Sequence, residues 1–206
     1  IRPGKVNCYN QAFDRSNGNF INIIAGDDTI PFDCLSKRLN SIKEYSKRKN
    51  LDINNEPIAQ LSKMITMSDD KNLSGRGLPP LSFKKGNPSG ATTFMNRAAA
   101  NIAFPLHKDL VAEDMWMHLC VKIFAKTYHF PHITYNYRIH KGNSVPYNRT
   151  YSEYRKYIMM RWDVYEKFYS KFKENLSELD KAYILKYCKL YNCIKNKNTF
   201  RIILIS

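Results

Sequence analysis

A short apolar run followed by a proline-led amphipathic segment is the feature that most constrains the fold. Residues 19–26 read Asn-Phe-Ile-Asn-Ile-Ile-Ala-Gly and are bounded by turn residues at Asn17–Gly18 and Gly26–Asp27. This composition predicts a short buried strand. Pro31 suits the first turn of a helix, and apolar residues then recur at spacings of three and four to about Lys49. Those residues are Phe32, Leu35, Leu39 and Ile42.

The rest of the first 146 residues continues the alternation of strands and helices. Residues 57–67 fit either a strand or a helix, and residues 90–96 predict a strand. Residues 112–128 predict a helix with acids in its first turn, and the alternation of residues 132–140 predicts a further strand. The order of these elements predicts an α/β architecture.

The chain changes character after about Pro146. Residues 147–206 carry 13 Lys/Arg against 6 Asp/Glu, and aromatic residues recur at helical spacing from Tyr154 to Phe172. Such a stripe favours core packing by about two to one over a helix that rests on an anionic membrane. A second helix is predicted from Leu176 to Tyr191. We therefore expect two parts, a catalytic domain in residues 1–146 and a basic helical extension in residues 147–206.

The bulk properties bound the class of protein. The net charge of +15 favours polyanionic partners without choosing among nucleic acid, lipid and phosphorylated substrates. The five cysteines form no CxxC pair, which favours a reducing compartment. No apolar run approaches the roughly 20 residues that span a bilayer, and no signal peptide is evident. We expect a cytoplasmic location, and the inner face of the cell membrane is the alternative site within the cytoplasm.

Two acidic pairs are candidates for chemistry. Asp27 and Asp28 directly follow the first predicted strand, where they would either cap the next helix or hold a divalent metal at the carboxyl end of a strand. Glu113 and Asp114 open a predicted helix, where they would either favour its dipole or supply a general base. From the residues alone, both alternatives stay open for each pair.

A third candidate segment is Tyr137–Ser144, which reads Tyr-Arg-Ile-His-Lys-Gly-Asn-Ser. It fits a basic Gly-Asn turn after a strand. Alternatively, Arg138, His140 and Lys141 would neutralise phosphate oxygens, and His140 would also ligate a metal.

The order of these motifs resembles the C-terminal part of a family 2 glycosyltransferase domain of GT-A fold. The resemblance covers roughly Gly4 to Val145 and rests on several motifs in the family's order. They are Asn10, Ala12, Gly18 and Phe20 before the acidic pair Asp27–Asp28, the helix led by Pro31, the strand Gly90–Arg97, the helix start at Glu113–Asp114, and Tyr137, Arg138, His140, Asn143 and Ser144.

The resemblance implies a Rossmann-like mixed sheet flanked by helices, without the N-terminal strands that hold the nucleotide in that family. It implies an inverting transfer of a sugar from a nucleotide-diphosphate sugar to a glycan or lipid-linked acceptor in surface polysaccharide synthesis. Asp114, or less favourably Glu113, would be the base. Asp27, Asp28 and His140 would hold Mn²⁺ or Mg²⁺, and Arg138, His140 and Lys141 would bind the diphosphate. The family's first metal-site aspartate is replaced here by Ala25.

Two alternatives accompany this reading. One is a truncated or inactive transferase that serves as a binding protein, and the other is a basic nucleic-acid-binding protein. The second is disfavoured because no nucleic-acid-binding motif is present, so we expect no nucleic-acid partner. Peripheral membrane contact is expected, if anywhere, through the basic extension. Met159–Trp162 is similar to the Arg-Trp element of processive family members but lacks the preceding glutamine, so we interpret it as helix packing.

Overall fold

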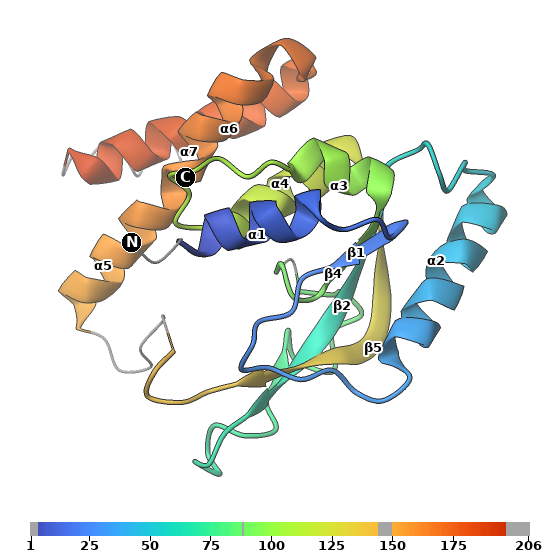
Figure 1. Ribbon diagram of the computed structural model, residues 1–206. Helices are drawn as coiled ribbons and strands as arrows, with labels where there is room; N and C mark the ends of the chain where they lie inside the picture. Colours follow the sequence, from blue (N-terminus) through green and yellow to red (C-terminus); the bar gives the residue numbers. More distant parts are fainter. Residues whose placement is uncertain (1–3, 88, 144–149, 197–206) are drawn as a thin grey trace.

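The computed structural model describes residues 4–87, 89–143 and 150–196, which form a mixed sheet covered by helices on both faces (Figure 1). The helices are α1 (Lys5–Asp14), α2 (Cys34–Lys49), α3 (Arg97–Ala103), α4 (Glu113–Phe124), α5 (Tyr151–Trp162), α6 (Val164–Phe172), the 3₁₀ turn η1 (Lys173–Asn175) and α7 (Glu178–Lys195). The strands are β1 (Phe20–Asn22), β2 (Ile58–Met67), β3 (Gly77–Leu78), β4 (Thr93–Asn96) and β5 (Lys126–Arg138). The predicted α/β mixed sheet with flanking helices is confirmed.

The long strand β2 organises the sheet. On one side it pairs in parallel with β5 from Ile58–Lys126 to Met67–Arg138, and on the other it pairs antiparallel with β4 and then with β3. β1 forms the far edge, antiparallel to β4. Residues 57–67, which fitted two structures in the sequence, are therefore almost wholly strand, because both edges of this segment are paired.

Two apolar clusters lie on the two faces of the sheet. Ile42 of α2 packs with Ile58 and Phe94 on one face. On the other face, Ala59 and Met95 join the larger cluster that α1, α3 and α4 cover. Because helices cover both faces, adjacent residues of β2 such as Ile58 and Ala59 are both fully buried.

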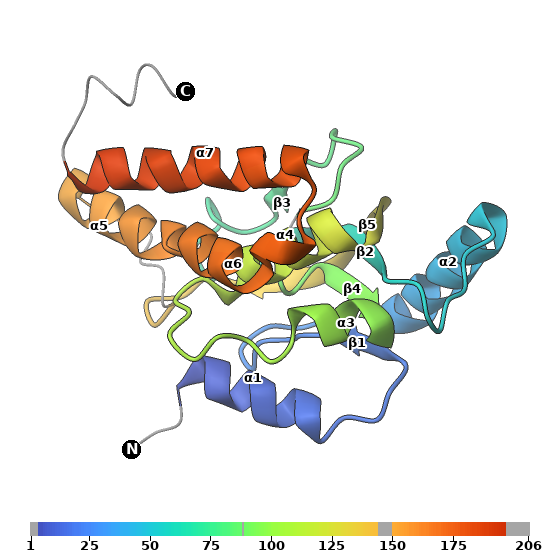
Figure 2. The ribbon, with the colours of Figure 1, turned by 90° about the horizontal axis from the view of Figure 1, so that it is seen from above.

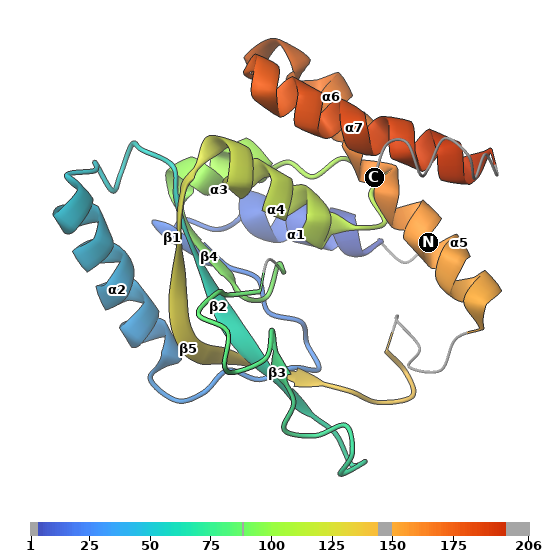
Figure 3. The ribbon, with the colours of Figure 1, turned by 180° about the vertical axis from the view of Figure 1, so that it is seen from behind.

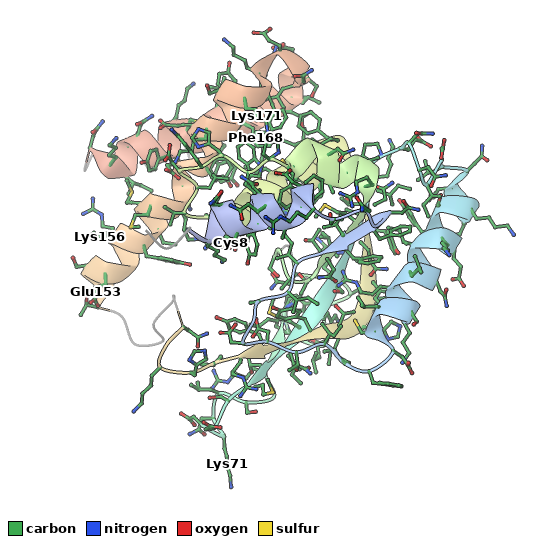
Figure 4. All side chains as sticks on the ribbon, in the orientation of Figure 1. Cys8, Lys71, Glu153, Lys156, Phe168 and Lys171 are labelled. Atoms are coloured by element: carbon green, nitrogen blue, oxygen red, sulfur yellow. The ribbon has the colours of Figure 1, made fainter. Side chains whose placement is uncertain are left out.

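Of the helices that follow residue 150, α6 packs onto α4, and α5 and α7 pack onto α6 and onto each other (Figures 2 and 3). Trp116 of α4 meets Phe168 of α6 edge to face with ring centroids 5.6 Å apart, and both side chains are fully buried. Figure 4 places Phe168 where α6 faces the α4 layer. The core-packing prediction for the aromatic stripe is thus confirmed at Tyr165 and Phe168.

The first predicted strand is much shorter than expected. β1 ends at Asn22, Ile23 is only half-buried and Ile24 is 41% exposed. The next pair in this register would be Ile23 with Thr93, but the Thr93 N–H donates to the Ser89 carbonyl at 3.0 Å, so the ladder does not continue. Asn22 Nδ2 donates to the carbonyl of Ala91 at 3.2 Å. The chain then crosses to β5, where Thr29 and Asn136 form an isolated antiparallel bridge.

Several helix boundaries also differ from the predictions. Phe32 lies outside α2 and is 92% exposed, so it is not part of the predicted apolar face. The helix predicted through Tyr128 ends at Phe124, because Lys126–Tyr128 pair with β2. The aromatic stripe is divided between α5 and α6 at Asp163. Helices α1 and α3 were not predicted.

Candidate functional site

The Asp27–Asp28 turn is fastened to β5 by Asp28. Its Oδ2 accepts a hydrogen bond from Tyr135 Oη at 2.6 Å, and its Oδ1 accepts one from the Arg138 backbone N–H at 2.6 Å. The Ala25 N–H donates to the same tyrosine hydroxyl at 3.1 Å. Burial, together with the hydrogen bond to Asp28, raises the pKa of Tyr135. Asp28 therefore holds the turn on the sheet, and it does not cap α2, so the capping prediction is wrong.

Asp27 is bound differently, because its partner is the imidazole of His140. Asp27 Oδ2 lies 3.0 Å from His140 Nε2, while His140 Nδ1 accepts the Gly142 N–H at 3.1 Å. Because Nδ1 of the neutral imidazole accepts this hydrogen bond, the ring proton is assigned to Nε2, which donates to Asp27. That hydrogen bond is the main reason that the pKa of Asp27 is lowered. Arg138 Nε also donates to the Asp27 carbonyl at 2.9 Å, so both side chains orient the turn.

The acids at the start of α4 form ion pairs with residues from both ends of the described chain. Arg161 of α5 donates from Nη2 to Asp114 Oδ1 at 2.8 Å and to Oδ2 at 2.6 Å. Lys5 of α1 pairs with Glu113. The Asp114 side chain is 32% exposed and that of Glu113 is 11% exposed. Asp114 is therefore the more accessible of the two carboxylates.

One cavity of about 720 Å³ brings the two acidic pairs together. Asp27, Asp28, Glu113 and Asp114 all line it, although Asp28 and Glu113 are 85 positions apart in the sequence. Its other described polar lining residues belong to α1, α5, β5, the turn after β5 and the segment before β4. They include Lys5, Tyr9, Asn87, Ser89, Tyr135, Tyr137, Asn143, Tyr157 and Arg161.

The basic residues of the Tyr137–Ser144 segment lie elsewhere. Arg138, His140 and Lys141 are not among the described residues that line the cavity. Arg138 and His140 instead form hydrogen bonds with Asp27, to its backbone carbonyl and its carboxylate respectively. Asn143 does line the cavity, and its side chain bridges this turn by accepting from the His140 N–H and donating to the Arg138 carbonyl. Ser144 lies outside the described residues.

The predicted metal ligands are brought together only in part. Among the described residues no group of three or more His, Cys, Asp and Glu side chains is arranged to hold a metal. Both oxygens of Asp28 already accept hydrogen bonds, and His140 Nε2 is directed at Asp27. Asp27 uses only Oδ2 in the hydrogen bonds of the described residues. The metal site stays a prediction, and its best-placed ligand is Asp27.

Several cavity residues were missed by sequence reasoning. Met159–Trp162 was interpreted as helix packing. Trp162 does pack, against Tyr165 and Tyr187, whereas Arg161 pairs with Asp114. Arg161 also donates to Tyr157 one helical turn earlier at 2.8 Å, and that spacing was a usable signal. Lys5 and Tyr9 gave no signal, because α1 was not predicted.

Asn10, by contrast, was singled out in the sequence and has a structural position. Its side chain exchanges two hydrogen bonds with the backbone of Leu106, accepting at 2.7 Å and donating at 2.9 Å. This pairing fixes α1 against the segment that leads to α4. The described helices include none long and apolar enough to cross a membrane.

The chain matches no protein-family model and no curated protein. Its fold is similar to the crystal structure of residues 1–349 of S. aureus TarS, with a TM-score of 0.53 and 16% identity over 92% of this chain and 51% of that one. The complex of the same TarS fragment with UDP-GlcNAc gives a TM-score of 0.53 and 16% identity over 90% of this chain and 51% of that one.

A longer TarS structure is also similar, with a TM-score of 0.50 and 15% identity over 89% of this chain and 29% of that one. The chain thus spans about half the length of the TarS fragment. At such identities the similarity establishes the fold alone, which is glycosyltransferase-like, without singling out family 2.

Proposed function

We propose that this protein is an inverting glycosyltransferase that moves a sugar from a nucleotide-diphosphate sugar to an acceptor hydroxyl. The observation that carries the proposal is the single cavity in which Asp27 and Asp28 meet Glu113 and Asp114. Such a reaction needs charge stabilisation at the leaving diphosphate and a separate carboxylate that takes the acceptor proton. Of the two acidic pairs on this cavity, inside a glycosyltransferase-like fold, one would hold a divalent cation that neutralises the diphosphate and the other would take the proton.

Asp114 is the base in this proposal. Its side chain is more exposed to solvent than that of Glu113, and both of its oxygens accept hydrogen bonds from Arg161. Arg161 is a positioning residue, because its planar guanidinium fixes the carboxylate in one orientation. The acceptor hydroxyl would give its proton to Asp114 as its oxygen attacks the anomeric carbon from the side opposite the diphosphate.

Asp27 is the proposed anchor for Mn²⁺ or Mg²⁺. Mg²⁺ is commonly held by one or two carboxylates together with substrate phosphates, which fits a site where one carboxylate oxygen is available. When bound, the metal would neutralise charge on the departing diphosphate. Asp28 would keep the turn on β5, and His140 would orient Asp27 through the hydrogen bond to Oδ2. We propose Arg138 as a second positioning residue and Lys141 as a basic residue near the diphosphate.

The substrates follow from the same reading. One of the similar structures is a complex with UDP-GlcNAc, so UDP sugars are the first donors to test. A glycan or lipid-linked molecule used in surface polysaccharide synthesis is the proposed acceptor. The ion pairs at Glu113 and Asp114 also fit a second candidate, a binding protein that retains the cavity but does not turn over.

The test compares Asp114→Asn with Glu113→Gln, the same chemical change at the adjacent position. Loss of a general base lowers turnover by about 10² to 10⁴-fold. We expect that loss for Asp114→Asn and a smaller loss for Glu113→Gln, with donor binding retained in both. Release of UDP from a panel of UDP sugars measures turnover, and calorimetry with Mn²⁺ present measures binding.

Wild-type turnover in Asp114→Asn would reject the assignment of the base. A larger loss in Glu113→Gln would transfer that role to Glu113. Donor binding by the wild-type chain without turnover on any acceptor would favour the binding protein.

A further inference from the structure

Strand β3 and the segment that follows it expose apolar side chains, of which Leu81 and Phe83 are not among the described residues that line the cavity. We define the apolar-basic loop as residues 76–86. In it Leu78 is 40% exposed, Leu81 49% and Phe83 56%, and residues 80–85 are exposed throughout. Three large apolar side chains within six positions are a concentrated patch, whereas single exposed ones are ordinary.

The protein fixes the shape of this loop from several sides. Lys63 of β2, itself buried, donates from Nζ to the Leu81 carbonyl at 2.7 Å. The Gly86 N–H donates to His129 Nδ1 of β5 at 2.9 Å. Gly86 also lies so close to the Leu61 carbonyl that a side chain there would overlap it. Contacts with β2 and β5 therefore fix the backbone of the loop, and this backbone presents the apolar side chains to solvent.

The charged residues of the loop itself have one sign. Arg76, Lys84 and Lys85 lie in the loop, and no aspartate or glutamate occurs between Asp70 and Asp109, whereas Lys71 in the preceding turn adjoins Asp69 and Asp70. Figure 4 shows Lys71 at the far end of the projection that β2 and β3 form, away from the helices. An apolar patch set among cations, with no acid in the segment, is complementary to a surface that is anionic outside and apolar beneath.

The loop adjoins the cavity. Leu78 at its start lines the cavity, and so do Asn87 and Ser89 just after its end. A partner that binds the loop therefore lies beside the cavity that contains the acidic residues.

We propose that the apolar-basic loop docks this protein on an anionic lipid bilayer. Leu81 and Phe83 enter the boundary between headgroups and acyl chains, and Lys84 and Lys85 contact anionic headgroups. Lipid is favoured over single-stranded nucleic acid because binding of the latter relies on stacked aromatic rings, and this loop offers one aromatic side chain with leucines and prolines. The inference does not depend on sugar transfer, because it rests on the loop alone.

This surface differs from the one expected from the sequence, which was the basic extension. In that extension Phe168 is buried against Trp116 of α4 and Tyr165 is buried against Tyr187 of α7, so these rings are not available to a bilayer. Exposed lysines such as Lys189 and Lys195 remain on α7. The two surfaces can therefore be separated by matched charge reversals.

The experiment measures co-sedimentation of the full chain with vesicles of phosphatidylcholine, with and without phosphatidylglycerol. Each basic residue near an anionic surface contributes about a fivefold factor to binding, so Lys84→Glu/Lys85→Glu is expected to weaken it by about 25-fold or more. Lys189→Glu/Lys195→Glu makes the same change of charge on α7 and is expected to leave binding within about twofold of the wild type, because that face is not docked.

A second pair of variants tests the apolar contribution. Phe83→Glu, alone and with Leu81→Glu, should lower binding by more than about tenfold, whereas Phe32→Glu/Leu179→Glu changes two exposed apolar residues elsewhere and should not. Circular dichroism checks that each variant is folded. No binding of the wild type to phosphatidylglycerol vesicles overturns the proposal. The proposal is also overturned if the α7 variant loses binding while the loop variants keep it. Tighter binding to an RNA homopolymer than to the vesicles overturns it as well.

Discussion

The two acidic pairs of the cavity are alike in sequence and unlike in how the fold holds them. Asp28 is bound by a tyrosine hydroxyl and a backbone N–H of β5, both uncharged donors. Asp114 and Glu113 are bound by the cations Arg161 and Lys5, which come from helices outside the sheet. The turn that carries the first pair is bonded to β5, whereas the position of the second pair depends on whether α1 and α5 are docked.

The largest expected effect tests that dependence on docking. Phe168→Ala removes a fully buried ring between α6 and α4, and it should lower the free energy of unfolding by about 3–5 kcal/mol. Loosening α6 should also free Arg161 from Asp114 and leave the Asp27–Asp28 turn intact. Urea denaturation measures the stability, and NMR titration of the carboxyls follows each acidic pair. Phe32→Ala is the control, because its 92% exposed ring should change stability by no more than about 0.5 kcal/mol.

An intermediate effect is expected at the turn itself. Asp28→Ala leaves the Tyr135 hydroxyl and the Arg138 N–H without their acceptor, and should cost about 2–3 kcal/mol of unfolding free energy. Asp27→Ala removes one exposed contact and should cost less than about 1 kcal/mol. The same urea measurements apply. Equal costs at the two positions would contradict the distinction between a structural Asp28 and an available Asp27.

The smallest effect is a dependence on pH. The hydrogen bond from His140 holds the pKa of Asp27 below that of an unfolded chain. Its contribution to stability is therefore present above about pH 4 and is lost as the pH falls through the folded pKa. His140→Ala should raise the pKa of Asp27, and the stability difference from the wild type attributable to this bond should shrink toward low pH. NMR titration of the Asp27 carboxyl measures the pKa, and an unchanged value would remove His140 from the site.

Sequence periodicity anticipated the elements whose burial is one-sided and local. The helices at Glu113–Phe124 and Glu178–Lys195 and the strand ending at Arg138 all carried such patterns. α1 and α3 were missed because α1 has one buried residue, Val6, and α3 is only seven residues long. β1 was predicted too long because its end depends on the distant segment before β4, where the Thr93 N–H donates to the Ser89 carbonyl instead of pairing with Ile23.

The amino-acid sequence by itself determined an α/β chain, the order of its longer elements other than residues 57–67, and the two acidic pairs, because these depend on residue spacing and on neighbours in the chain. Only the tertiary structure decided that all four acids line one cavity and that Arg161 forms an ion pair with Asp114, 47 positions earlier in the sequence. It also decided that Arg138 and His140 form hydrogen bonds with Asp27 and are not among the described lining residues of the cavity. The exposure of Leu81 and Phe83 was decided in the same way. These facts depend on which distant surfaces meet, because a side chain's partner is fixed by packing between elements.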